Sequence, residues 1–170
     1  MDKKLAYQFD KIYKSYSTSI YRFVYIKVSS QETAEDLTSE VFVRFWKTFQ
    51  KSGQDRILNP KAFLYKMAKN VIVDFYRKQT QPLPLPIDEV VEIADSSQDI
   101  SKRELALSDQ EQIQKAIKNL KDDDQDVILW YYLDQMPVGE IAEIVDKSEN
   151  AVRVMIHRAM QELREQLPKM

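Results

Sequence analysis

The stretch Met136-Pro137-Val138-Gly139-Glu140-Ile141-Ala142-Glu143-Ile144-Val145-Asp146-Lys147-Ser148-Glu149-Asn150-Ala151-Val152-Arg153 predicts two short helices joined by a polar turn. Apolar residues recur at intervals of three and four residues from Val138 to Val145, which is the pattern of an amphipathic helix. Asp146-Lys147-Ser148 interrupts that pattern, and the Ser148 hydroxyl is suited to cap a second helix, whose apolar face continues to Leu163. This arrangement is typical of a DNA-reading helix-turn-helix, although an ordinary helical hairpin has the same spacing.

Polar side chains near the start of the second helix are the candidates for contacts with duplex DNA. Asn150 can offer its amide to adenine, and Arg153 can offer a bidentate guanidinium to guanine or to a phosphate. His157 is the single histidine of the chain and no cysteine accompanies it, so we expect no metal site there. The predicted duplex-binding set is Ser148, Glu149, Asn150, Arg153, Val154, His157 and Arg158.

Composition limits the class of protein. The 170 residues suffice for one medium domain or two small ones, and two glycines with 44% apolar residues favour a helix-rich globular fold. The absence of cysteine excludes disulfides, thiolate zinc sites and cysteine nucleophiles. No apolar run approaches about 18 residues, and the first residues lack the apolar core of a signal peptide. We therefore expect a cytoplasmic protein without membrane insertion and without a cofactor.

Charge is distributed unevenly along the chain, although the net charge is only −2. Residues 1–78 hold fifteen Lys and Arg against eight Asp and Glu, a net charge of +7. Residues 79–108 have a net charge of −4, and residues 109–170 have a net charge of −5. A basic first part favours a polyanionic partner, while a solvated basic surface is the simpler alternative.

The first 78 residues predict a set of helices. Residues 5–28 are aromatic-rich and periodic, and they predict one or two helices. Thr33-Ala34-Glu35-Asp36 has the pattern of a capping box that starts the next helix, whose apolar face extends over residues 37–49. Residues 51–58 predict a loop. Asn59-Pro60 then predicts a helix start, with Asn59 as the cap, and the helix runs to about Lys78.

The middle of the chain differs from both ends. Three prolines at alternate positions, Pro82, Pro84 and Pro86, forbid helix and favour extended chain, and an acidic stretch follows them. The predicted fold is therefore all-α, with two small helical domains joined by an extended, acidic, proline-containing linker. The domains comprise residues 1–78 and 109–170, the linker comprises residues 79–108, and the C-terminal domain holds the helix-turn-helix.

The helix over residues 59–78 combines cations with aromatic rings. Five of its residues are Lys or Arg and four are Phe or Tyr, against a single acidic residue. Cations can follow phosphates while rings stack on unpaired bases, a combination that suits single-stranded nucleic acid. An amphipathic helix with core aromatics is the alternative, and we expect Phe63 and Phe75 to be core residues. The phosphate candidates are Lys61, Lys66, Lys69, Arg77 and Lys78, and Tyr76 is a stacking candidate.

In combination, four segments resemble the extracytoplasmic-function sigma factors of bacterial RNA polymerase. The segment from Ala34 to Trp46, AEDLTSEVFVRFW, resembles the family's polymerase-binding helix. Pro60-Lys61-Ala62-Phe63-Leu64, followed by Ala68, Asn70, Asp74 and Arg77, resembles its −10 recognition segment. Glu140-Ile141-Ala142 with Ser148 and Ala151-Val152-Arg153 resembles its −35-reading helix-turn-helix, and His157-Arg158-Ala159 with Leu163-Arg164 resembles its tail. The resemblance covers nearly the whole chain except the linker.

The resemblance implies a sigma factor that joins core RNA polymerase and recognises promoter DNA, and that is not itself an enzyme. It implies a polymerase-docking surface formed by Asp36, Leu37, Glu40, Val41 and Phe42. For the single-stranded −10 element it implies Asp55, Arg56, Asn59, Lys61, Phe63, Lys66, Lys69, Asn70, Tyr76, Arg77 and Lys78. It implies that the duplex-binding set given above recognises the upstream −35 element. Many members of the family are held by an anti-sigma factor, which is therefore a further expected partner.

Two other functions stay open at this point. A helix-turn-helix regulator that acts without polymerase would explain the C-terminal part but not the basic, aromatic N-terminal part. A sigma-like protein that only titrates a partner is the other alternative. Departures from the family pattern keep this alternative open: Gln135, Pro137 and Met155 stand where the family usually has Gly, Ser and Arg. Lys121 and Ser39 also depart from the pattern.

Overall fold

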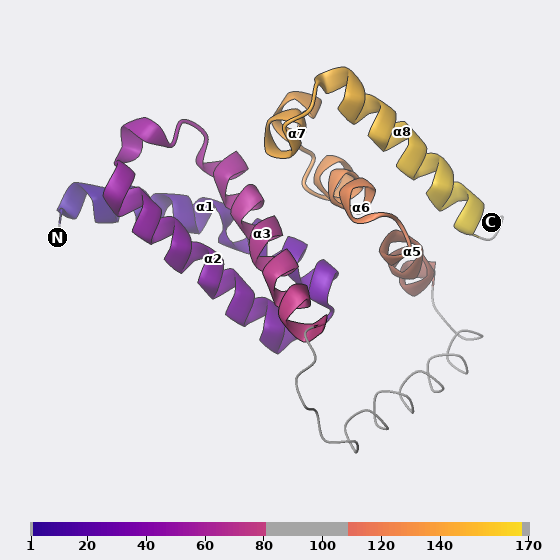
Figure 1. The fold of residues 1–170 in the computed structure, drawn as a ribbon, viewed down its shortest axis with the longest axis horizontal. Helices are drawn as coiled ribbons and strands as arrows, with labels where there is room; N and C mark the ends of the chain where they lie inside the picture. The colour runs from indigo at the N-terminus through magenta and orange to yellow at the C-terminus, as the bar shows by residue number, and fades with distance from the viewer. Residues whose placement is uncertain (1, 81–108, 168–170) are drawn as a thin grey trace, which may run out of the picture.

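The computed structural model describes residues 2–80 and 109–167, and within these ranges the chain is helical with no strand. The N-terminal part contains α1 (Lys3–Val28), α2 (Gln31–Ser52), the short 3₁₀ turn η1 (Gln54–Arg56) and α3 (Pro60–Thr80). The C-terminal part contains α5 (Asp109–Lys118), α6 (Asp122–Ile128), the π-helical turn η3 (Leu129–Leu133), α7 (Val138–Val145) and α8 (Glu149–Gln166). These elements confirm the predicted all-α class (Figure 1). The predicted extended conformation of residues 81–108 lies outside the described residues.

Capping side chains set the helix starts of the N-terminal part. The Ser30 hydroxyl accepts the backbone N–H of Thr33 at 3.3 Å, so α2 begins at Gln31. The predicted capping box at Thr33 is therefore wrong, because a serine three residues earlier already satisfies the first free amides. The predicted cap at Asn59 is confirmed, since its side-chain oxygen accepts the Ala62 N–H at 3.1 Å. Residues 5–28, predicted as one or two helices, belong to one helix.

The predicted helix-turn-helix is confirmed as a local structure. Helix α7 ends at Val145, and Asp146 adopts a left-handed conformation with φ of 55°, which turns the chain toward α8. The Ser148 hydroxyl then accepts the Ala151 N–H at 3.1 Å and caps α8. The buried side of α8 packs on α6 and α7, which fixes the orientation of α8 within the C-terminal half.

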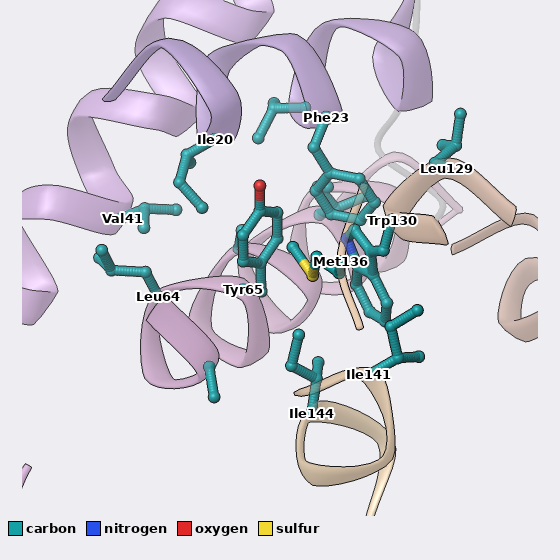
Figure 2. Packing of buried hydrophobic residues seen from close by; sticks show 14 of the residues in the cluster. Ile20, Phe23, Val41, Leu64, Tyr65, Leu129, Trp130, Met136, Ile141 and Ile144 are labelled. Carbon is teal, nitrogen blue, oxygen red and sulfur yellow. The ribbon is translucent and has the colours of Figure 1, made fainter. Parts of the chain in front are cut away.

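The two halves share one apolar core in this structure. Helices α1, α2 and α3 pack on one another, and α3 also packs along α7 (Figure 1). Figure 2 shows Phe23 and Tyr65 directed toward Trp130, with ring centroids 5.4 Å and 5.7 Å from the indole. Met136 and Ile141 are buried in the same cluster. Burial of these aromatic side chains stabilises the contact between the halves.

A smaller apolar cluster stabilises the far end of the C-terminal half. It consists of Ala116, Leu120, Ile128, Ala159 and Leu163, and it joins α5 and α6 to the last turns of α8. No described helix has the length and apolar character needed to cross a membrane.

Candidate polymerase and nucleic-acid interfaces

The leading turns of α8 present a polar face to solvent. Arg153 donates to the Asn150 side-chain oxygen at 3.1 Å and to a Glu149 carboxylate oxygen at 3.3 Å, so these three side chains form one hydrogen-bonded group. Val154 stands beside them and is 62% exposed. The opposite side of the helix, which includes Val152 and Ile156, is buried. A helix that reads a major groove needs this division, with its first outward side chains available to bases.

Two members of the predicted duplex-binding set have structural partners. Arg158 makes two hydrogen bonds with the Asp124 carboxylate, at 2.6 Å and 3.2 Å, and thereby ties α8 to α6. Hydrogen bonding to Asp124, whose charge adds to the effect, raises the pKa of Arg158. Asp124 is 1% exposed and depends on this partner. Arg158 is thus an anchor of the fold, whereas Ser148 is the cap of α8 and His157 is exposed.

A groove alongside α8 contains residues that sequence reasoning missed. Tyr131 and Tyr132 from η3 line it together with Arg153, His157 and Arg164 of α8. Both tyrosines are partly exposed, and their rings pack edge to face with centroids 4.9 Å apart. The spacing of Arg153, His157 and Arg164 along one helix face was a usable signal. The tyrosines gave no such signal, because a π-helical turn places them and helical periodicity does not predict it.

The basic side of α3 faces acidic residues of the C-terminal half. Lys61 pairs with Glu140 at 2.9 Å, and Lys66 pairs with Asp146 at 3.1 Å. Further contacts of the same kind are Lys69 with Asp123 at 2.7 Å and with Asp126 at 3.6 Å, and the Asn59 amide with Glu143 at 2.8 Å. Four predicted −10 residues therefore have protein acids as partners in this structure.

The remaining members of the predicted −10 set occupy two regions. Asp55 and Arg56 are exposed on η1, between α2 and α3. On α3, Asn70 is exposed at the middle of the helix, and Tyr76, Arg77 and Lys78 are exposed near its end. The Tyr76 hydroxyl donates to the Lys27 carbonyl. Phe63 packs on Phe45 with centroids 5.8 Å apart. Phe63 and Phe75 are half-buried against the main cluster, which agrees with their expected core role.

Buried charges mark the centre of the contact between the halves. The Lys27 ammonium lies 2.7 Å from Asp126, and the side chains are 8% and 1% exposed. Burial raises the pKa of Asp126 even though Lys27 opposes the shift. Burial also opposes the charge on Lys69, but the hydrogen bond from Lys69 to Asp123 and the charges of Asp126 and Asp123 outweigh it and raise the Lys69 pKa.

A second polar contact crosses the interface at Asp134. The Tyr65 hydroxyl donates to one Asp134 oxygen at 2.8 Å, and Arg22 pairs with the other. Burial, followed by the charge of Asp134, raises the pKa of Tyr65, so the phenol stays protonated as a donor. Both contacts orient η3 against α1 and α3.

The predicted polymerase-docking set divides into exposed and buried members. Asp36 is exposed, and Glu40 is half-buried in an ion pair with Arg44. Val41 is 0% exposed and Leu37 is also buried, so these two side chains face the core and not solvent in this structure. Both lie on the apolar stripe with which α2 packs onto the core.

Phe42 is buried too, but it borders an apolar groove of about 540 Å³ between α1 and α2. Tyr13, Val43 and Trp46 line the same groove, and Tyr13 packs edge to face on Phe42 at 4.8 Å. Tyr13 and Val43 are exposed, so they are accessible apolar side chains of this groove. The sequence motif did not include Tyr13, because it lies on a different helix.

Comparison with known proteins identifies the family. The model of Sigma-70 region 2 matches residues 12–81, and the model of Sigma-70, region 4 matches residues 110–163. The chain is 28% identical to the ECF RNA polymerase sigma factor BldN of Streptomyces coelicolor over 94% of its length, and it spans 60% of that protein. It is 23% identical to the ECF RNA polymerase sigma factor SigM of Bacillus subtilis, with 91% of this chain and 92% of SigM covered.

The chain belongs to the extracytoplasmic-function (ECF) sigma factors. As an RNA polymerase sigma factor, it directs promoter-specific initiation of transcription together with core polymerase.

Solved structures agree with the fold of this ECF sigma factor. CnrH, in complex with the cytosolic domain of CnrY, matches with a TM-score of 0.65 at 19% identity, covering 96% of this chain and 95% of the other. The sigma factor RpoE of Bartonella quintana, in complex with the anti-sigma factor NepR, matches with a TM-score of 0.63 at 16% identity, covering 94% and 96%. Within residues 2–80 and 109–167, no group of three metal-ligating side chains is present.

Proposed function

We propose that this ECF sigma factor reads the upstream element with the first turns of α8 and binds the unpaired −10 strand along α3. The single observation that carries the proposal is the division of α8. Glu149, Asn150, Arg153 and Val154 lie outward on the leading turns, while the inner side is packed. Asn150 and Arg153 supply the amide and guanidinium groups that discriminate adenine and guanine.

For the −10 element, α3 and the turn before it provide the contacts. Lys61, Lys66 and Lys69 supply charge along the helix, and Arg77 and Lys78 extend it at the end. Asp55, Arg56 and Asn59 border the start of the helix, where backbone groups and short polar side chains suit capture of a flipped base. Tyr76 offers an exposed ring for stacking.

For core polymerase, the docking surface comprises Asp36 and Glu40 with the exposed apolar residues at the rim of the groove between α1 and α2. This revised set adds Tyr13 and Val43 and omits the buried Leu37 and Val41. A mixed surface of two acids and two accessible apolar side chains suits a helical partner with basic and apolar residues. Catalysis of RNA synthesis remains with the polymerase, and the site of action is the cytoplasm, where the polymerase works.

An anti-sigma factor is a further proposed partner. The RpoE structure of Bartonella quintana contains the anti-sigma factor NepR, and that chain shares the fold described here. The same apolar groove between α1 and α2 is available to such a protein. Binding there would compete with polymerase for the docking surface.

Run-off transcription tests the proposed function. The purified chain is combined with core polymerase and a library of genomic fragments, and transcripts are mapped. We expect specific transcripts that are absent without the chain. Duplex binding that is independent of polymerase, with no transcripts, would indicate a stand-alone regulator. Polymerase binding with no transcript from any fragment would indicate a protein that only titrates its partner.

A further inference from the structure

We propose that acidic residues of α6 and α7 act as an internal competitor for the −10 strand. In the closed arrangement they take the positions of phosphates on α3, so strand binding requires the two halves to separate. The proposal rests on the proposed role of α3 in holding the −10 strand.

The ion pairs are concentrated on the face of α3 that is proposed to bind DNA. Lys61, Tyr65 and Lys69 recur at intervals of four residues and therefore lie along one side of the helix. Lys61 and Lys69 each have a carboxylate within 2.9 Å, and Tyr65 is fully buried between them. Lys66, on the adjacent row, lies 3.1 Å from Asp146. A phosphate backbone following α3 would need these same ammonium groups.

Charge complementarity explains why the acids are arranged in this way. Helix α7 carries Glu140 and Glu143, and Asp146 directly follows it. All three contact polar groups of α3 or of the residue before it. Helix α6 adds Asp123 and Asp126. The basic half (net +7 over residues 1–78) and the acidic half (net −5 over residues 109–170) are thus joined by these ion pairs. Carboxylates at these positions repel a DNA strand, and they also pair with the α3 lysines that the strand would need.

The packing also indicates a contact that can open. Trp130 is fully buried in the cluster between the halves, yet its indole Nε1 has no hydrogen-bond partner among the described residues. A buried donor without a partner disfavours the closed arrangement. Several of the ion pairs are partly exposed, such as Lys66 with Asp146, and water can replace such pairs at little cost.

The end of α3 is not covered in the same way. Arg77 and Lys78 are exposed, and Arg77 pairs with Asp74 of the same helix at 3.8 Å. The closed chain therefore keeps a small cationic surface, for which we expect weak binding to a DNA strand. The full surface becomes available only when α6 and α7 move away.

A charge-neutralising variant tests the competition without polymerase. The probe is a fluorescein-labelled 20-mer of oligo(dT), and affinity is measured by fluorescence anisotropy. The variant E140Q/E143Q/D146N, called the α7 variant, removes the two acids of α7 and the Asp146 carboxylate at its C-terminal cap. The matched control E32Q/D109N/E165Q removes three exposed acids outside these contacts and changes the net charge equally. We expect the α7 variant to bind about tenfold more tightly than both the wild type and the control, because cations of α3 become available to phosphates.

Opening is followed in the same samples by tryptophan emission. The chain has two tryptophans, so a W46F background leaves Trp130 as the reporter. We expect a red shift in the α7 variant and none in the control. Adding K61Q and K66Q to the α7 variant should remove the gain in affinity. A red shift without a gain in affinity, or a gain no larger than that of the control, would overturn the proposal.

A cross-link that holds the two halves together tests whether the closed arrangement weakens strand binding. This test remains informative if the α7 variant stays closed. The chain lacks cysteine, so K66C/D146C introduces one thiol on each half. The double variant is joined with a short bismaleimide, and the same variant capped with N-ethylmaleimide is the control. We expect the linked chain to bind oligo(dT) at least about fivefold more weakly than the capped chain. Equal affinities would refute the competition. Because neither assay contains polymerase, this outcome is distinct from a failure of run-off transcription.

Discussion

At the residue scale, Arg153 is the side chain that decides how α8 recognises DNA. It is exposed on the leading turns and is held by Asn150 and Glu149. We expect R153A to weaken recognition of the upstream element by about 1–3 kcal/mol if its guanidinium contacts a base. Holoenzyme binding to promoter fragments with single changes upstream measures this effect, with K14A as the control. An equal loss on every upstream sequence would identify a phosphate contact, and no loss would exclude Arg153 from the interface.

Arg158 has a different expected effect, on stability. Its removal leaves the Asp124 carboxylate buried without its partner, which should lower the free energy of unfolding by about 1–3 kcal/mol. Urea unfolding of R158A, compared with R164A at an exposed position of the same helix, measures the difference. The double variant R158A/D124A should recover part of the loss. If R158A were as stable as R164A, Arg158 would return to the set of free DNA-contacting residues.

The pair of Lys69 and Asp123 predicts a pH dependence. A hydrogen bond from Lys69 lowers the pKa of Asp123 below its ordinary value of 3.8. Its stabilising contribution is therefore present above that value and is lost as the pH falls through the lowered pKa. We expect wild type to be more stable than D123N near neutral pH, with the difference vanishing in strong acid. A difference that persists unchanged at the lowest pH would contradict this assignment.

At the element scale, α2 has one buried and one accessible side, and substitutions should respect that division. V43R changes an exposed residue beside the groove and should abolish association with core polymerase while leaving thermal stability near that of wild type. V41R places a charge in the core and should unfold the domain instead. A pull-down with core polymerase, read together with a melting curve, separates the two. Normal association of V43R would remove the groove rim from the docking surface.

Element-level features were largely predictable from the sequence, and the exceptions have physical causes. Asn59 and Ser148 were identifiable as caps because their effects are local. Val41 was assigned to a surface because a family motif contains core and surface positions alike, and periodicity alone does not separate them. The pairing of Lys61 with Glu140 was not predictable, since it joins residues far apart in the chain.

At the scale of the whole molecule, the segregation of charge has a second explanation besides a polyanionic partner. The basic half was predicted to bind nucleic acid, and in this structure it binds the acidic half of the same chain. The apolar contacts around Trp130 and the surrounding ion pairs together hold the two halves in the closed arrangement. Because the partly exposed pairs are screened by salt, we expect opening to increase between low and high ionic strength. Trp130 emission in the W46F background, recorded across a salt series, measures this, and emission independent of salt would contradict it.

The central claim is that the free chain adopts a closed form, and that its two halves separate in the complex with core polymerase and promoter DNA. Double electron–electron resonance between spin labels at E32C and E165C tests it most directly, because both positions are exposed and lie on opposite halves. We expect a single narrow distance distribution for the free chain and a clearly longer mean distance in the complex with core polymerase and promoter DNA. An identical distribution in both states would contradict the claim.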